Sequence, residues 1–269
     1  MYKSYWGLQE KPFENTPDPR FLYQSADTME TYARLLYALK SNRGAVLLTG
    51  ESGCGKTLMA RALIQGLDPE RTDVALLANP CRHPDDLLPE ILFQIGGDEP
   101  PQDRTQVVRQ LNATLYDNFS AGRETAVIID EGQLLENPKF FEEFCVLLNF
   151  QLNDAFLVTL VLVGQPLLAE RVRNCANLDE RLSARGVVRA LEKEDVGPYI
   201  ELRLSVAGRT APAFSPDAVE MVAQHTGGVP RRINHLCDLC LVIGYSRKVD
   251  VVDEDLVYRL ILNEGENRV

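Results

Sequence analysis

The sequence predicts an α/β protein, a parallel sheet sandwiched by helices, followed by a small all-helical lid domain. Short apolar runs alternate with segments of helical periodicity as far as about residue 191, an order typical of a parallel sheet covered on both faces. A glycine-rich loop separates the first apolar run from the helix that follows it. Beyond that point the apolar spacing is helical, with no convincing strand.

The expected strands are short runs of aliphatic and β-branched residues bounded by polar residues or glycine. Runs of this length and composition suit the central strands of a parallel sheet, and apolar residues at helical spacing fill the intervals between them. The expected strands cover residues 45–49, 73–80, 125–131, 157–165 and 187–191, and the expected helices cover residues 29–41, 56–67, 85–96, 104–119 and 139–151.

Composition divides the chain into three parts. Residues 1–25 are rich in proline and aromatic residues, and we expect an ordered arm without a helix there. Residues 26–191 carry the strands and form the α/β domain. Residues 192–269 form the lid domain, with helical segments at 194–208, 215–228, 230–246 and 253–265. The segment that starts at Ser215 carries signals of a helix N-terminus, because serine caps a helix and Pro216 suits its first turn.

The chain of 269 residues is acidic, with a formal net charge of −11. This balance argues against broad, charge-driven coating of nucleic acid or anionic lipid, although it is compatible with a local basic patch. No apolar run reaches the length of about 18 residues that a membrane helix needs, and the N-terminus lacks the apolar core of a secretory signal. We therefore expect a cytoplasmic protein.

The six cysteines are scattered through apolar segments, which favours reduced core thiols over a disulfide framework. Cys237 and Cys240 form a single C-x-x-C pair near His235. A structural zinc site usually needs four ligands, and the surrounding segment has apolar residues at helical spacing. We therefore interpret this pair as part of a core helix.

The segment GESGCGKT matches the phosphate-binding loop pattern in full. Its glycines let backbone N–H groups turn toward phosphate oxygens, and the following helix presents its positive end to the same charge. Lys56 is expected to reach the β- and γ-phosphates, and the Thr57 hydroxyl to hold Mg²⁺. The predicted nucleotide-binding residues of this segment are Gly50, Glu51, Ser52, Gly53, Cys54, Gly55, Lys56, Thr57 and Leu58.

A second element, AVIIDEGQ, places two adjacent carboxylates at the end of an expected strand. The carboxyl edge of an open parallel sheet is where ligands bind. Asp130 is then a nucleotide-binding carboxylate on the Mg²⁺ side of the site, and Glu131 can polarise a water for attack on the γ-phosphorus. This pairing favours hydrolysis over transfer to a small acceptor. The alternative for Glu131 is an N-terminal charge for the next helix.

Four more polar residues are candidate catalytic groups. Gln165 ends an expected strand, where its amide can bridge the γ-phosphate and the attacking water or simply cap the strand. Arg181 and Arg185 are expected to share one helix face, either as a source of an arginine that reaches a neighbouring subunit's phosphate or as surface salt bridges. Arg231 follows the turn GGVP at a helix start, where a cation is disfavoured by the dipole and another purpose is indicated.

Together these elements resemble an AAA+ ATPase, and most closely the ExeA/GspA-type secretion ATPases, with the MSHA-pilus biogenesis ATPase as a near relative. The residues that carry the resemblance span almost the whole chain. They are the arm YWGLQEKPFENTPDPRFLY, the loop GESGCGKT, IIDEGQLL, LLNFQLNDAFLVTLVLVGQPLL, ERLSARG and GGVPRRINHLCD.

The resemblance implies roles for individual residues. Lys56 and Thr57 correspond to Walker A, and Asp130 and Glu131 to Walker B. The resemblance also implies ATP and Mg²⁺ as cofactors, and an arm that passes near the adenine around residues 17–23. The remaining roles are Gln165 as sensor 1, Arg231 as sensor 2, Arg181 or Arg185 as the arginine finger, and Asn79 as a residue that holds Glu131 inactive until a partner binds.

The resemblance leaves two processes open. One is the ATP-driven assembly of a secretion or pilus complex in the bacterial envelope, with a homo-oligomer recruited to the inner membrane by a partner protein. The closer motif match and the acidic charge favour it. The other is an ATP-dependent regulator of the transposition or replication type that binds duplex DNA. Longer secretion ATPases continue into a membrane helix and a peptidoglycan-binding domain, so wall binding is not expected of this chain.

Overall fold

The computed structural model describes residues 2–41, 44–153 and 155–266, and it divides into two compact units. The α/β unit contains residues 26–51 and 59–188, and the helical unit contains residues 1–25, 52–58 and 189–269. The predicted arm and lid domain therefore lie together in the helical unit, which also includes most of the phosphate loop. Residue 1 of the predicted arm and residues 267–269 of the predicted lid lie outside the described residues.

The α/β unit is built on a parallel sheet with the strand order β2-β3-β4-β1-β5. Each strand is six or seven residues long, and helices connect them. The predicted fold class is confirmed. The strands are β1 (Ala45–Gly50), β2 (Thr72–Leu77), β3 (Glu124–Ile129), β4 (Thr159–Gly164) and β5 (Leu182–Val188).

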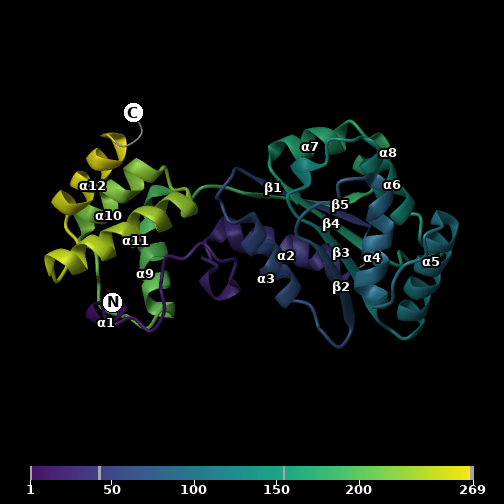
Figure 1. The fold of residues 1–269 in the computed structure, drawn as a ribbon, viewed down its shortest axis with the longest axis horizontal. Helices are drawn as coiled ribbons and strands as arrows, with labels where there is room; N and C mark the ends of the chain where they lie inside the picture. The colour runs from purple at the N-terminus through teal and green to yellow at the C-terminus, as the bar shows by residue number, and fades with distance from the viewer. Residues whose placement is uncertain (1, 42–43, 154, 267–269) are drawn as a thin grey trace. The chain divides into compact units, whose positions relative to one another are not determined.

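Helices cover both faces of this sheet, as Figure 1 shows. Alternate residues of β1 point to opposite sides: Leu47 packs in one apolar cluster, and Val46 and Leu48 pack in the other. The first cluster includes α4 (Leu87–Gly96), α5 (Arg104–Ser120), α6 (Lys139–Leu147), α7 (Pro166–Arg173) and α8 (Ala176–Asp179), and the second includes α2 (Ala26–Lys40) and α3 (Lys56–Gln65).

The fifth strand lies earlier in the chain than the sequence pattern predicts. The expected strand was 187–191, whereas β5 starts at Leu182 and ends at Val188. Its register against β1 shifts between the pairs Ala45–Leu182 and Val46–Ala184. The extra residue turns Leu182 and Ala184 to opposite faces, and this breaks the alternation by which a strand is found in a sequence.

This strand also corrects the interpretation of two arginines. Arg185 lies within β5 and Arg181 directly precedes it, so the pair does not share a helix face as expected. The helix next to this pair in the chain is α8, which ends at Asp179, and the preceding helix α7 begins at Pro166 immediately after Gln165. Proline at the first helical position fits because its missing N–H would have no partner inside the helix.

The helical unit packs α9 (Lys193–Val206), α10 (Pro216–Thr226), α11 (Pro230–Arg247) and α12 (Glu254–Glu266) around one apolar core. These helices match the four predicted segments. Cys237 and Cys240 are fully buried in this core, as the helix interpretation predicts. Among the described residues, none of the helices combines the length and apolar character that crossing a bilayer requires.

The N-terminal arm belongs to the same core. Trp6 is almost fully buried and its ring N–H donates to the Leu241 carbonyl of α11 at 2.8 Å. Contrary to expectation, the arm contains two short helical turns, α1 (Tyr2–Tyr5) and η1 (Pro19–Phe21). Asp18 explains the second turn, because its carboxylate accepts the Arg20 backbone N–H and so caps it.

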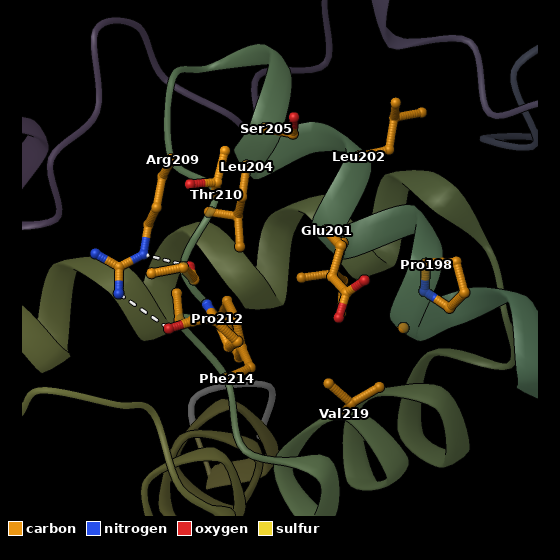
Figure 2. Close-up of a pocket in the computed structure, with 14 residues that line it drawn as sticks. Pro198, Glu201, Leu202, Leu204, Ser205, Arg209, Thr210, Pro212, Phe214 and Val219 are labelled. Atoms are coloured by element: carbon orange, nitrogen blue, oxygen red, sulfur yellow. Dashed lines mark hydrogen bonds between the residues drawn. The ribbon is translucent and has the colours of Figure 1, made fainter.

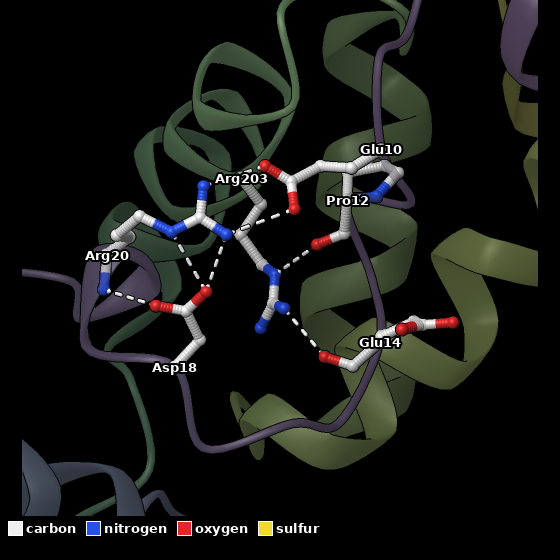
Figure 3. Close-up of polar contacts among 6 residues, drawn as sticks. All are labelled: Glu10, Pro12, Glu14, Asp18, Arg20 and Arg203. Carbon is white, nitrogen blue, oxygen red and sulfur yellow. Dashed lines mark hydrogen bonds and ion pairs between the residues drawn. The ribbon is translucent and has the colours of Figure 1, made fainter.

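One buried arginine of α9 holds the arm in place (Figure 3). The Arg203 guanidinium donates to the Glu14 carbonyl at 2.7 Å and also to the Pro12 carbonyl. It lies 4.5 Å from the centre of the Phe21 ring, which suits a cation–π contact. Arg20 adds an exposed ion pair with Glu10 in the arm.

We predict that Arg203→Ala loosens the arm and lowers the melting temperature. Two backbone carbonyls lose a charged donor, and such bonds are worth about 3 kcal/mol together in partly buried settings. Calorimetry of the full chain measures the effect. Lys193→Ala is the control, because its exposed ion pair with Glu220 should leave the melting temperature unchanged. Equal melting temperatures for the two variants would contradict this role of Arg203.

Candidate nucleotide site

The phosphate loop joins β1 to α3 as the sequence predicts. Lys56 and Thr57 are the first two residues of α3, so the positive end of that helix faces the loop. Lys56 is 7% exposed. Gly53 has φ +81°, a left-handed conformation that favours glycine. Glycine at this position fits the expectation that the backbone N–H groups of the loop turn toward phosphate oxygens.

Arg231 contacts this loop within the helical unit. Its backbone N–H donates to the Gly53 carbonyl at 3.2 Å, and its guanidinium lies 3.4 Å from the Ser52 hydroxyl. A Cβ added to Gly53 would lie 2.9 Å from the Arg231 Cβ, so only glycine fits without a shift. The structure therefore brings the predicted sensor arginine to the phosphate loop.

The carboxylates of the second element lie at the carboxyl edge of the sheet. Asp130 follows β3 directly and is 4% exposed, and its carboxylate accepts the Glu131 backbone N–H at 2.8 Å. Glu131 has φ 51° and ψ 33°, a left-handed conformation that is unusual for a residue with a side chain. Such strain of about 1–2 kcal/mol is typical of functional sites, where the surrounding structure maintains it.

A residue that the sequence analysis missed connects this element with the end of β4. The Gln133 side-chain amide donates to the Glu131 carboxylate at 2.5 Å, and its carbonyl accepts the Gln165 backbone N–H at 2.9 Å. The only sequence signal is its position two residues after Glu131. Gln133 therefore joins the predicted water-activating carboxylate to the predicted sensor at Gln165.

Asn79 follows the second strand, as expected. It is exposed two residues after the end of β2. The hydrogen bond to the Glu131 carboxylate that the structure records comes from Gln133. The role of Asn79 as a restraint on Glu131 therefore stays a prediction.

The two candidate arginine fingers have different surroundings. Arg181 donates to the Cys145 carbonyl of α6 at 3.2 Å and is half-buried. Arg185 is exposed and forms an ion pair of 2.7 Å with Asp179. Breaking such a surface pair costs little, so the Arg185 head group can change partners more readily than that of Arg181.

The residues proposed for Mg²⁺ fit a hard, oxygen-liganded cation. Thr57 supplies a hydroxyl at the start of α3, and Asp130 a buried carboxylate at the end of β3. Mg²⁺ in nucleotide sites takes one or two protein ligands and fills its other positions with phosphate oxygens and water.

A separate pocket of about 430 Å³ lies within the helical unit (Figure 2). It is bounded by α9, the segment 209–214 and the first turns of α10, and its walls include Leu204, Phe214 and Val219. Arg209 at its rim is bonded to backbone carbonyls of Ala211 and Pro212. None of the predicted nucleotide-binding or catalytic residues lines this pocket.

Comparison with known proteins identifies a matching domain family and a relative of this chain. Residues 39–172 match the family model described as an AAA domain. General secretion pathway protein A of Aeromonas hydrophila is 37% identical over 255 residues, which cover 92% of this chain. The chain spans 45% of the length of that relative.

Solved structures show the same fold at low sequence identity. The ORC2 protein of Aeropyrum pernix, in complexes with ADPNP and ADP, superimposes with a TM-score of 0.71 at 17% identity, over 93% of this chain and 71% of that chain. A Walker-type ATPase of Pyrococcus abyssi superimposes with a TM-score of 0.63 at 18% identity, over 95% of this chain and 79% of that chain.

The thiol beside Arg181 yields a pH-dependent prediction. Burial, with a smaller effect of the neighbouring Cys175, raises the pKa of Cys145 from 9.0 to about 11. Because the thiolate is the reactive form, alkylation of Cys145 should still rise about tenfold per pH unit between pH 9 and 10. Peptide mapping by mass spectrometry measures the rate, with a small-molecule thiol as control. A rate that levels off above pH 9 would contradict the raised pKa.

Proposed function

We propose that this chain is an AAA+ ATPase that hydrolyses ATP to energise assembly of a bacterial envelope secretion or pilus complex. The match of residues 39–172 to an AAA domain and the 37% identity to general secretion pathway protein A support this proposal. The observation that carries the ATPase is the complete phosphate loop following β1, on a sheet whose β3 delivers Asp130 and Glu131 to the same edge.

The loop binds the triphosphate in this proposal. Backbone N–H groups of residues 50–58 surround the phosphates, and Lys56 neutralises the β- and γ-phosphate charge. Thr57 and Asp130 hold Mg²⁺, which screens the phosphate charge when bound. Arg231, already in contact with the loop at Gly53, reports the state of the nucleotide to the helical unit.

Hydrolysis depends on the polar groups at the carboxyl edge of the sheet. Glu131 orients a water and accepts its proton as the water attacks the γ-phosphorus, and the Gln165 side chain contacts the γ-phosphate. The strained backbone of Glu131 and its fixed carboxylate support this role. A group held in place before the reaction contributes more than one that must be ordered during it.

Full activity requires assembly with further copies of this chain. Arg181 or Arg185 enters the site of a neighbouring subunit and stabilises the charge of the transition state. A protein of the cell envelope recruits the assembly from the cytoplasm to the inner membrane. The relationship to general secretion pathway protein A supports this choice of process.

Two substitutions separate nucleotide binding from hydrolysis. Lys56→Ala should lose ATP binding, because the phosphate charge is no longer neutralised. Glu131→Gln should retain ATP binding and lose about 100-fold or more in kcat, because the amide cannot accept a proton. Equilibrium binding of a fluorescent ATP analogue and phosphate release measure the two effects. An unchanged kcat in Glu131→Gln would remove this residue from its role.

A mixing experiment identifies the arginine finger. Arg181→Ala or Arg185→Ala should abolish hydrolysis in the pure variant, and addition of Lys56→Ala protein should restore it. The restored site combines one subunit's nucleotide with the other's arginine. Arg173→Ala is the control, because this exposed residue of α7 has no predicted role. If neither arginine variant is rescued by mixing, the finger does not act between subunits.

Binding to duplex DNA tests the choice of process. At moderate salt we expect no ATP-dependent binding by protein that still hydrolyses ATP, because the chain is strongly acidic. Fluorescence anisotropy with a long labelled duplex, with and without ATP across a salt series, measures it. Tight binding that weakens steeply with salt would instead favour the DNA-regulator function.

A further inference from the structure

We propose that Gln133 is a positioning residue that holds the carboxylate of Glu131 and links it to the backbone of Gln165. The proposal rests on the ATPase function above and goes beyond it, because the resemblance assigned the control of Glu131 to Asn79. It predicts that the amide of Gln133 sets the orientation of the water-activating carboxylate.

Both ends of the Gln133 side chain are used. Its NH₂ group donates to one oxygen of Glu131, and its carbonyl oxygen accepts the Gln165 N–H at 2.9 Å. An amide provides a donor and an acceptor on one short planar group, whereas an ionised carboxylate provides acceptors alone. Replacing the amide by a carboxylate therefore removes the donor to Glu131 and keeps the acceptor for Gln165.

The backbone around Gln133 is also fixed. The Arg171 guanidinium, from α7, donates to the carbonyls of Gln133 and Leu135 at 2.6 and 2.7 Å. A Cβ at Gly164 would lie 2.9 Å from the Gln133 side-chain oxygen, so the absence of a side chain there leaves room for the amide. Gln133 thus lies in a site shaped by both β4 and α7.

This arrangement explains how a flexible glutamate is ordered. Fixing a glutamate side chain costs rotamer entropy, which the bond from Gln133 offsets before any nucleotide binds. One carboxylate oxygen is held, and the orientation of the other oxygen toward the attacking water is set with it. A change at Gln165 is transmitted to Glu131 through one side chain.

The test is Gln133→Glu in the full chain. A glutamate at position 133 can still accept the Gln165 N–H, but its carboxylate repels that of Glu131 and has no proton to donate at pH 8. We expect kcat for ATP to fall at least tenfold, with the affinity for a fluorescent ATP analogue within twofold of wild type. A loss in kcat without a matching loss in affinity separates a positioning role from a general loss of folding.

Gln94→Glu is a matched control. In α4, Gln94 makes the same two bonds: its carbonyl accepts the Leu76 backbone N–H, and its NH₂ group donates to Glu90, each at 2.7 Å. The substitution therefore removes the same kind of contact, away from the predicted catalytic residues. We expect an unchanged kcat.

A stability measurement tests the contact without catalysis. Gln133→Glu should lower the melting temperature through the like charges, and combination with Glu131→Gln should restore it, because the amide then donates in the reverse direction. If the double variant does not recover the melting temperature, the side chains of Gln133 and Glu131 do not contact each other in solution. If it restores stability but wild-type protein hydrolyses no ATP, the proposed function fails and Gln133 is only a structural link. An active Gln133→Glu enzyme with wild-type kcat would overturn the positioning role.

Discussion

Burial of the parallel sheet on both faces is the constraint on which the rest of the α/β unit depends. Leu47 and Leu162 are buried against the helices of one layer, and Val46 and Leu48 are buried against the helices of the other. Parallel strands oblige the chain to return through these helices, so every strand ends at the same edge of the sheet. Gly50, Ile129 and Gly164 end three such strands, and the chain continues from them into the phosphate loop, the acidic pair and Gln165.

The polar groups at that edge hold one another in place. Asp130 fixes the backbone of Glu131, Gln133 fixes its carboxylate, and Arg171 fixes the turn that carries Gln133. A left-handed glutamate is unfavourable alone and persists because each neighbour opposes its relaxation. In the same network, one side chain, that of Gln133, bonds both the Glu131 carboxylate and the Gln165 backbone N–H.

Local pattern was sufficient for most of the fold. Strands β1 to β4 and helices α9 to α12 were predicted because their apolar spacing is regular and their ends carry glycine, proline or capping residues. Strand β5 was misplaced because its register shift reverses the alternation near Ala184. The phosphate loop and the acidic pair were found by motif, whereas Gln133 was not, because its importance arises from a contact with Gln165 that no local pattern encodes. The catalytic roles stay predictions.

The hydrogen bond between Arg231 and Gly53 also affects the stability of α11. Arg231 lies in the first turn of α11, where backbone N–H groups have no acceptor inside the helix, and Val229 before it offers no side-chain cap. The Gly53 carbonyl accepts the Arg231 N–H, so the phosphate loop serves as an N-terminal cap of a helix almost 180 residues further along the chain. A substitution at Gly53 therefore changes the stability of α11 together with the loop, and any loss of nucleotide binding that it causes has two physical origins.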